Sequence, residues 1–226
     1  MYRPHVLLSL DGDRRARSSV LRPSLRGFWH ARSGMIATEF ALVLPLLVTL
    51  YFAMLTFSDG FAVKQRVQSV ARTAADLVGR LPTSPTGSPP VVNAAEITNV
   101  SKAAAAVLAP YDPAGATVAL ASVVVRLNAG NLEGRVCWSA ARRIENRSTV
   151  AEMAVPASMA KNALVTVPPG YQVPGMAYLL SEVHHVYRPV IGHAITGDVD
   201  LSDKVPWPVR AGQQVVWQGE APCPVN

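Results

Sequence analysis

The sequence predicts an α+β fold: a long N-terminal helix, with a transmembrane half and an amphipathic half, leads into a mostly antiparallel sheet domain with a second helix. Three observations support this prediction. Residues 35–57 form an almost uninterrupted apolar run. Residues 58–80 carry apolar side chains at helical spacing, and the chain from residue 116 onward is rich in short β-branched segments.

The positive charge of the chain is concentrated at its N-terminus. Residues 1–33 contain seven arginines and two aspartates, whereas the rest of the chain contains 14 Lys/Arg and 13 Asp/Glu. A nucleic-acid-binding module needs a basic face on its folded part, so this balance excludes nucleic acid as an expected partner. We therefore treat residues 1–34 as a basic cytoplasmic leader.

The apolar run at residues 35–57 is long enough to be a membrane span. Its 23 positions would extend about 35 Å as a helix, against a hydrocarbon core of about 30 Å. The arginine-rich leader places the N-terminus in the cytoplasm and the rest of the chain outside. A cleaved secretory signal is the alternative, but its apolar region is shorter, at about 7–15 residues, and ends at a small-residue cleavage site. We expect a single-pass protein in contact with membrane lipid.

Glu39 is the one charged residue in this span. A carboxylate in a span costs a few kcal/mol and usually has a partner. If the chain were cut between Gly34 and Met35, the new ammonium of Met35 in an adjacent subunit would supply that partner. The alternative is that Glu39 lies at the headgroup level and its side chain reaches water.

Beyond the span, residues 58–80 read as an amphipathic extension of the same helix. Phe61, Val67, Val70, Ala71, Ala74, Leu77 and Val78 fall at helical spacing, and Gly79 is a plausible end. The proline-rich segment 81–92 reads as a linker. Residues 93–109, with Glu96 near the start and Pro110 at the end, predict the second helix of an extracytoplasmic domain at residues 93–226.

The remaining segments predict the sheet. Residues 116–127 and 134–140 predict a hairpin around a turn at 128–131. Residues 148–161 are ambiguous and include a possible short helix. Residues 163–167, 178–192 and 214–218 predict further strands, of which the last would close the sheet. Within 178–192, alternation places Val183, His185 and Tyr187 on one face and Glu182 and His184 on the other.

The segment from Gly34 to Phe40, followed by an apolar run that contains Pro45, resembles a type IV prepilin cleavage region. The string GMIATEFALVLPLLVTLYF is similar to the TadE-like pseudopilins of tight-adherence pilus systems. That resemblance implies cleavage after Gly34 by a prepilin peptidase, with Glu39 and Phe40 as the acidic–aromatic recognition pair. The family often has tyrosine where this chain has Phe40. A looser likeness continues in VCWSAAR and SEVHHVYRPVIG.

The resemblance further implies a minor pseudopilin of the bacterial inner membrane with a periplasmic C-terminal domain, which takes part in assembling a Flp/Tad-type pilus. The expected partners are the prepilin peptidase, other pilins or pseudopilins, and Tad assembly proteins. No cofactor and no catalytic role are expected. The alternative is an uncleaved bitopic envelope protein whose outer domain binds a partner or ligand.

Two cysteines, Cys137 and Cys223, lie beyond the span, in what the topology makes an oxidising compartment. An even pair there favours a disulfide, with two separate buried thiols as the alternative. His184, His185 and His193 form the histidine cluster. No metal site is expected, because adjacent strand residues point to opposite faces.

Overall fold

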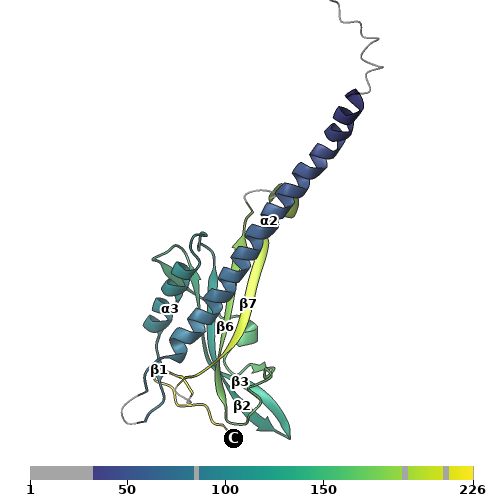
Figure 1. The fold of residues 1–226 in the computed structure, drawn as a ribbon. Helices are drawn as coiled ribbons and strands as arrows, with labels where there is room; N and C mark the ends of the chain where they lie inside the picture. The colour runs from purple at the N-terminus through teal and green to yellow at the C-terminus, as the bar shows by residue number, and fades with distance from the viewer. Residues whose placement is uncertain (1–32, 84–86, 190–192, 211–213, 226) are drawn as a thin grey trace, which may run out of the picture. The chain divides into compact units, whose positions relative to one another are not determined.

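The computed structural model describes residues 33–83, 87–189, 193–210 and 214–225. The leader therefore lies outside the described residues, except for its last two. The chain divides into two compact units, residues 1–49 and 50–226. One helix, α2, contributes residues to both units (Figure 1).

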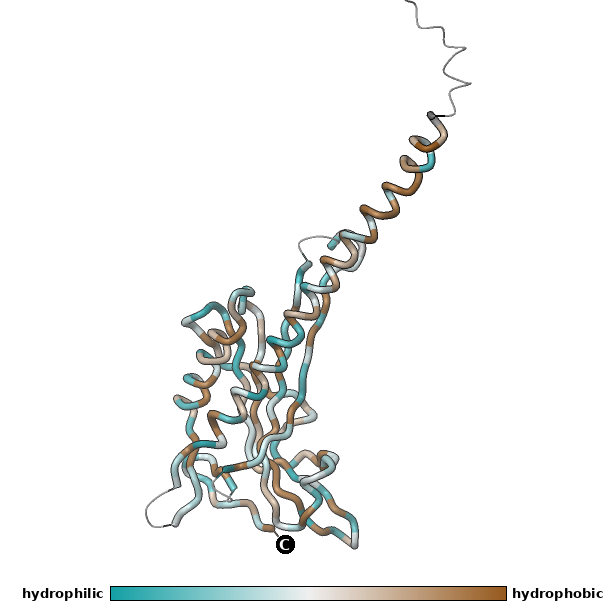
Figure 2. The backbone as a smooth tube through the Cα atoms, viewed as in Figure 1, coloured by the Kyte–Doolittle hydropathy of each residue, from teal (hydrophilic) through white to brown (hydrophobic). Residues whose placement is uncertain are grey.

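Helix α2 spans Ser33–Gly79 without interruption, which confirms the single long helix predicted from the sequence. Every residue from 35 to 55 is exposed. Figure 2 shows almost continuous hydrophobic colouring along this part of the helix and mixed colouring along the part beside the sheet. Apolar side chains on all sides of an exposed helix require apolar surroundings, so this part is suited to a lipid bilayer.

The second part of α2 packs on the sheet domain through one stripe of small and β-branched side chains. Val63, Val67, Val70, Ala74 and Val78 are almost completely buried. The sequence prediction put Phe61 and Leu77 on this stripe, and that was wrong. The stripe instead starts at Val63, which leaves those two side chains on the other faces of the helix, exposed to solvent.

The domain has a six-stranded, wholly antiparallel main sheet with the order β4-β3-β2-β6-β7, and β5 pairs with β3. The strands are β2 (Thr117–Asn128), β3 (Asn131–Ile144), β4 (Val150–Met153), β5 (Leu164–Val165), β6 (Ala177–Tyr187) and β7 (Val199–Pro208). Two short helical turns, η1 (Ala157–Met159) and α4 (His193–Thr196), lie in the connections. The predicted hairpin is β2–β3, and the ambiguous segment 148–161 contains β4 and η1.

Helix α3 (Ala94–Val107) is the predicted second helix, and its start is set by a capping box. The Asn93 Oδ1 atom accepts from the Glu96 N–H at 2.9 Å, and Glu96 Oε2 accepts from the Asn93 N–H at 2.8 Å. These two bonds satisfy backbone donors that a helix start leaves without partners.

The segment before α3 and the C-terminal segment meet in a small second sheet. Strand β1 (Val91–Val92) pairs in parallel with β8 (Val216–Trp217). The segment predicted as a linker therefore ends in a strand. The prediction that residues 214–218 close the main sheet was wrong, because β8 pairs with β1 in a separate sheet.

The main sheet is buried on both faces, which explains the nearly continuous apolar run in β2. Helices α2 and α3 cover one face, where Val118, Leu120 and Leu179 pack against Val67 and Ile97. The segment between β4 and β6 covers the other face. It packs Met159 and Val167 onto the opposite side of β2 and β6, against Ala121, Val123, Tyr178 and Leu180.

Candidate functional site

The predicted processing residues lie together in the first turns of α2. Met35, Glu39 and Phe40 are all exposed. The Thr38 hydroxyl donates to the Met35 carbonyl at 2.8 Å. Gly34 is the second residue of the helix, so the predicted scissile bond lies at its extreme N-terminal end.

Glu39 differs in its bonding from the threonines of the apolar run. Thr49 donates to the carbonyls of Pro45 and, at 3.1 Å, Leu46, and Thr56 donates to the Phe52 carbonyl at 2.9 Å. Hydroxyls that bond back to their own helix are compatible with lipid. Among the described residues, the Glu39 carboxylate has neither a hydrogen bond nor an ion pair.

A comparison with protein-family models places this segment in a known context. Residues 34–76 match the family described as TadE-like protein. The resemblance to TadE-like proteins is confirmed over these residues. The match begins at Gly34 and covers the apolar run and most of the amphipathic extension. Among curated proteins and solved structures, none matches the chain significantly.

The matched residues 34–76 lie within helix α2, which is long and apolar enough to cross a membrane. This fits a single-pass membrane protein. Together, the family match and the apolar helix fit a pilus-associated envelope protein.

Asp59 lies two residues beyond the apolar run and forms hydrogen bonds that link α2 to two other segments. The sequence analysis did not predict these contacts. The Asp59 Oδ1 atom accepts from the Tyr111 hydroxyl at 3.1 Å, and its Oδ2 accepts from the Tyr187 hydroxyl. Burial, followed by the bond to Asp59, raises the pKa of Tyr187 to about 12. Burial is also the first cause of the raised pKa of Tyr111. Asp59 therefore ties the segment after α3 and the end of β6 to the helix.

Asp76, near the other end of α2, makes a second connection to the sheet. It forms ion pairs with Arg80 at 2.6 Å and Arg210 at 2.8 Å, and it accepts from the Trp207 ring N–H at 3.2 Å. The hydrogen bond from Arg80 is the main cause of the lowered pKa of Asp76. These contacts hold the C-terminal end of β7 beside the end of the helix.

The structure bonds Cys137 to Cys223, as the sequence analysis predicted. The pairing of β2 with β3 shifts between Ser122 and Val123, so that Ser122 lies opposite Trp138, Val123 lies opposite Val136, and Cys137 is the extra residue of a β-bulge.

The bulge turns two consecutive side chains toward the C-terminal segment. Cys137 bonds to Cys223, and the Trp138 ring N–H donates to the Val215 carbonyl at 2.8 Å. The Trp138 ring also lies 5.5 Å from that of Trp217, centroid to centroid. Regular alternation would send Cys137 and Trp138 to opposite faces. The bulge thus lets both residues fasten the same tail.

The three histidines do not converge. His184 Nε2 lies 3.1 Å from Glu182 Oε1, and His193 Nε2 lies 2.8 Å from Asp198 Oδ1. His185 is buried on the opposite face of β6 from His184, and that burial lowers its pKa. Within the described ranges, no group of three or more metal-ligating side chains comes together.

Proposed function

We propose that the chain is a TadE-like minor pseudopilin, made with its basic leader and cut between Gly34 and Met35 by a prepilin peptidase. It then takes part in assembling a Flp/Tad-type pilus. The observation that carries this proposal is the family match that begins at Gly34 and includes the Glu39–Phe40 pair. Gly34 suits a scissile position, because the absence of a side chain lets the backbone approach a protease closely.

Glu39 acts after the cut through its charge. Cleavage exposes an ammonium on Met35, and Glu39 lies four residues later, within the lipid-suited part of the helix. The exposed Glu39 carboxylate, which lacks a described partner, pairs with the Met35 ammonium of an adjacent subunit. Each of two charges in a low-dielectric medium then compensates the other, and their contact sets the axial register of the two helices.

The arginine-rich leader supports an orientation in the bacterial inner membrane with the N-terminus in the cytoplasm and the sheet domain in the periplasm. The Cys137–Cys223 disulfide supports the same orientation, because disulfides persist in oxidising compartments. The partners are the prepilin peptidase during processing, and then other pilins or pseudopilins and Tad assembly proteins. The chain works by assembly and has no enzymatic role.

Substitution of Glu39 tests the proposal in cells that make the pilus. Glu39→Gln removes the charge and keeps the size of the side chain, so we expect surface fibres to be lost. Glu39→Asp keeps the charge, so we expect a reduced number of surface fibres to remain. Thr49→Val is the matched control within the span, because the Thr49 hydroxyl is satisfied by its own helix.

The cleavage state of the Glu39→Gln chain separates two roles of the carboxylate. An uncut chain indicates a role in recognition by the peptidase, and a cut chain without fibres indicates pairing between subunits. Normal fibres from Glu39→Gln would show that the carboxylate has neither role.

A further inference from the structure

An apolar cavity of about 290 Å³ lies where the apolar run of α2 ends. Its walls come from four elements of the 50–226 unit: α2, the end of β6 with Pro189, the end of α4 at Thr196, and the start of β7. The side chains that matter here are Phe57, Phe61, Tyr187, Pro189, Val199 and Leu201. Its volume is at the lower limit of about 300–1,000 Å³ for pockets that hold drug-sized ligands, so it suits a slender apolar group better than a bulky one.

Two aromatic side chains at the cavity remain uncovered by the domain. Phe57 is 76% exposed and Phe61 is 71% exposed, and they are one helical turn apart on the same face. Phe61 lies about 6 Å beyond Phe57 along the helix axis. The headgroup layer of a bilayer is roughly 5–8 Å thick on each side, so a span that ends at Phe57 places Phe61 within that layer.

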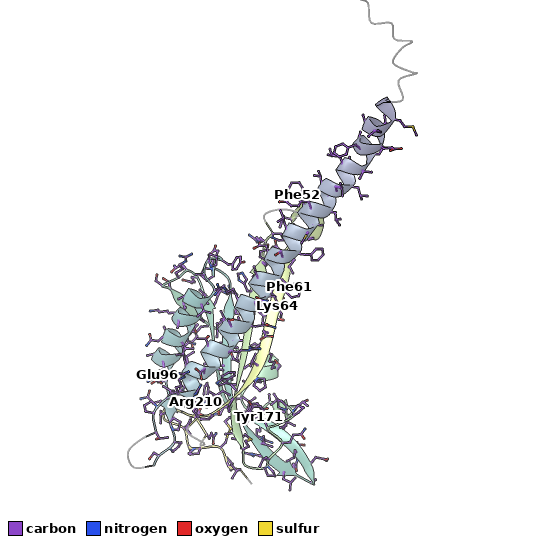
Figure 3. The ribbon with its side chains drawn as sticks, viewed as in Figure 1. Phe52, Phe61, Lys64, Glu96, Tyr171 and Arg210 are labelled. Carbon is purple, nitrogen blue, oxygen red and sulfur yellow. A yellow bond between two sulfur atoms is a disulfide. The ribbon has the colours of Figure 1, made fainter. Side chains whose placement is uncertain are left out.

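Lys64 places a cation at the cavity rim, on the same helix as Phe61 (Figure 3). Its ammonium donates to the Ser202 carbonyl of β7. An ammonium carries three donors, so two remain for another acceptor. Lys64 lies about 10 Å beyond Phe57 along the axis, near the outer edge of the headgroup layer, so the two remaining donors of its ammonium are close to the level of lipid headgroups.

The sequence after Phe61 argues against a partner helix as the occupant of this face. A packed helix would need apolar side chains to continue at three- and four-residue intervals. The next positions on the face of Phe57 and Phe61 are Gln65, Gln68 and Arg72. The exposed apolar surface therefore stops within one turn of the run, as expected for side chains at the membrane interface, where aromatic residues are enriched.

We propose that the cavity seats an acyl chain of a phospholipid at the edge of the bilayer, with the lipid phosphate on Lys64. The base of the extracytoplasmic domain thereby rests on the membrane surface. This inference depends on the membrane span at residues 35–57 and is independent of cleavage and of pilus assembly.

Photocrosslinking of the full chain in lipid vesicles tests the proposal. The photoreactive residue p-benzoylphenylalanine replaces Phe61, and the protein is reconstituted in vesicles of phosphatidylcholine and phosphatidylglycerol. Leu50 is the positive control, because it is exposed within the apolar run. Val173 is the negative control, because it is exposed in the segment before β6, at the opposite end of that strand from Tyr187.

We expect the mass of one phospholipid to be added at Phe61 with a yield close to that at Leu50, and no such adduct at Val173. An adduct of Phe61 with a second polypeptide, or a lipid yield no higher than at Val173, would overturn the proposal. Absence of lipid adducts at Leu50 as well would overturn the span, and the proposal with it.

The contribution of Lys64 is tested in the same assay. A lysine near an anionic surface favours anionic lipid by about fivefold, so Lys64→Gln should lower the phosphatidylglycerol-to-phosphatidylcholine ratio in the Phe61 adduct by about that factor. Lys102→Gln, an exposed change on α3, should leave the ratio unchanged. An unchanged ratio in Lys64→Gln would show that Lys64 does not hold the phosphate.

Discussion

The hydroxyl of Tyr187 donates a hydrogen bond to the carboxylate of Asp59, which lies 128 positions earlier in the chain. Asp59 also accepts from Tyr111, so three distant segments meet two residues beyond the apolar run. The contact fixes the sheet domain to the helix close to where the apolar run of the helix ends. Stability of the domain should therefore depend on this one carboxylate.

The first prediction concerns that carboxylate. Asp59→Ala leaves the Tyr111 and Tyr187 hydroxyls without their acceptor, and we expect a loss of about 1–3 kcal/mol in the free energy of unfolding. Urea unfolding of the protein in detergent micelles measures this loss of unfolding free energy. Ser58→Ala is the matched control, because Ser58 is exposed and adjacent. An equal effect of the two substitutions would contradict the role of Asp59.

The second prediction is a loss of stability at high pH. The pKa of Tyr187 is raised to about 12 from an ordinary value of 10. The folded state therefore holds this proton more tightly than the unfolded state does. The corresponding stabilisation is complete below pH 10 and is lost as the pH rises toward 12.

Phenolate absorbance provides the measurement. Tyr187→Phe should remove one late-titrating tyrosine and reduce the fall in stability over this pH range. Tyr178, whose pKa burial also raises to about 12, should still titrate late in that variant and serves as an internal reference. A Tyr187→Phe titration curve identical to that of the wild type would disprove the assignment.

The third prediction concerns the disulfide. Cys137 and Cys223 are 86 residues apart, and the chain-entropy relation gives about 4–5 kcal/mol of stabilisation for a loop of that length. We expect the double variant Cys137→Ala/Cys223→Ala to lose stability on this scale and to change its tryptophan fluorescence, because the bond holds Trp217 near Trp138. Free thiols in the native oxidised protein would contradict the bond itself.

A fourth prediction compares Gly134, where an added Cβ would clash with neighbouring atoms, with Gly60, where it would have space. A Cβ on Gly134 of β3 would lie 2.9 Å from both the Val165 carbonyl oxygen and the Val165 side chain, so Gly134→Ala forces strands apart and should destabilise the domain by about 1–3 kcal/mol. A Cβ on Gly60 would meet only Tyr187, at 3.9 Å. Gly60→Ala should therefore stabilise α2 by about 1 kcal/mol.

Thermal unfolding of the two variants under identical conditions gives the comparison. The predicted signs are opposite, so each variant serves as the control for the other. Destabilisation by both substitutions to the same extent would show that the space around these glycines does not decide the outcome.

The sequence was sufficient to predict the elements with strong local signals. The apolar run and Gly79 predicted the course of α2, and Asn93 with Glu96 marked the start of α3. Alternation in β6 correctly separated His184 from His185. In each case neighbouring residues along the chain carry the information, so no knowledge of the tertiary fold was needed.

Other features depended on tertiary contacts and were missed. The sequence analysis did not predict strand β7 (Val199–Pro208), which contains two prolines, Pro206 and Pro208. Both prolines are tolerated because β7 is an edge strand.

The site residues likewise separate into those that a local sequence pattern indicates and those that depend on contacts between distant segments. Gly34, Glu39 and Phe40 are close together in the sequence, so a local motif was enough to propose them, and their role stays a prediction. The bulge at Cys137 and the meeting of Asp59 with two tyrosines could not be predicted, because each joins segments far apart in the chain, and register shifts leave no local pattern.

The most direct test of the account is the N-terminus of the mature protein. Intact-mass measurement and N-terminal sequencing of the protein from native membranes should find a chain that begins at Met35, whereas Gly34→Glu should retain the leader. A wild-type chain that still carries residues 1–34 in cells with an active prepilin peptidase would contradict the account.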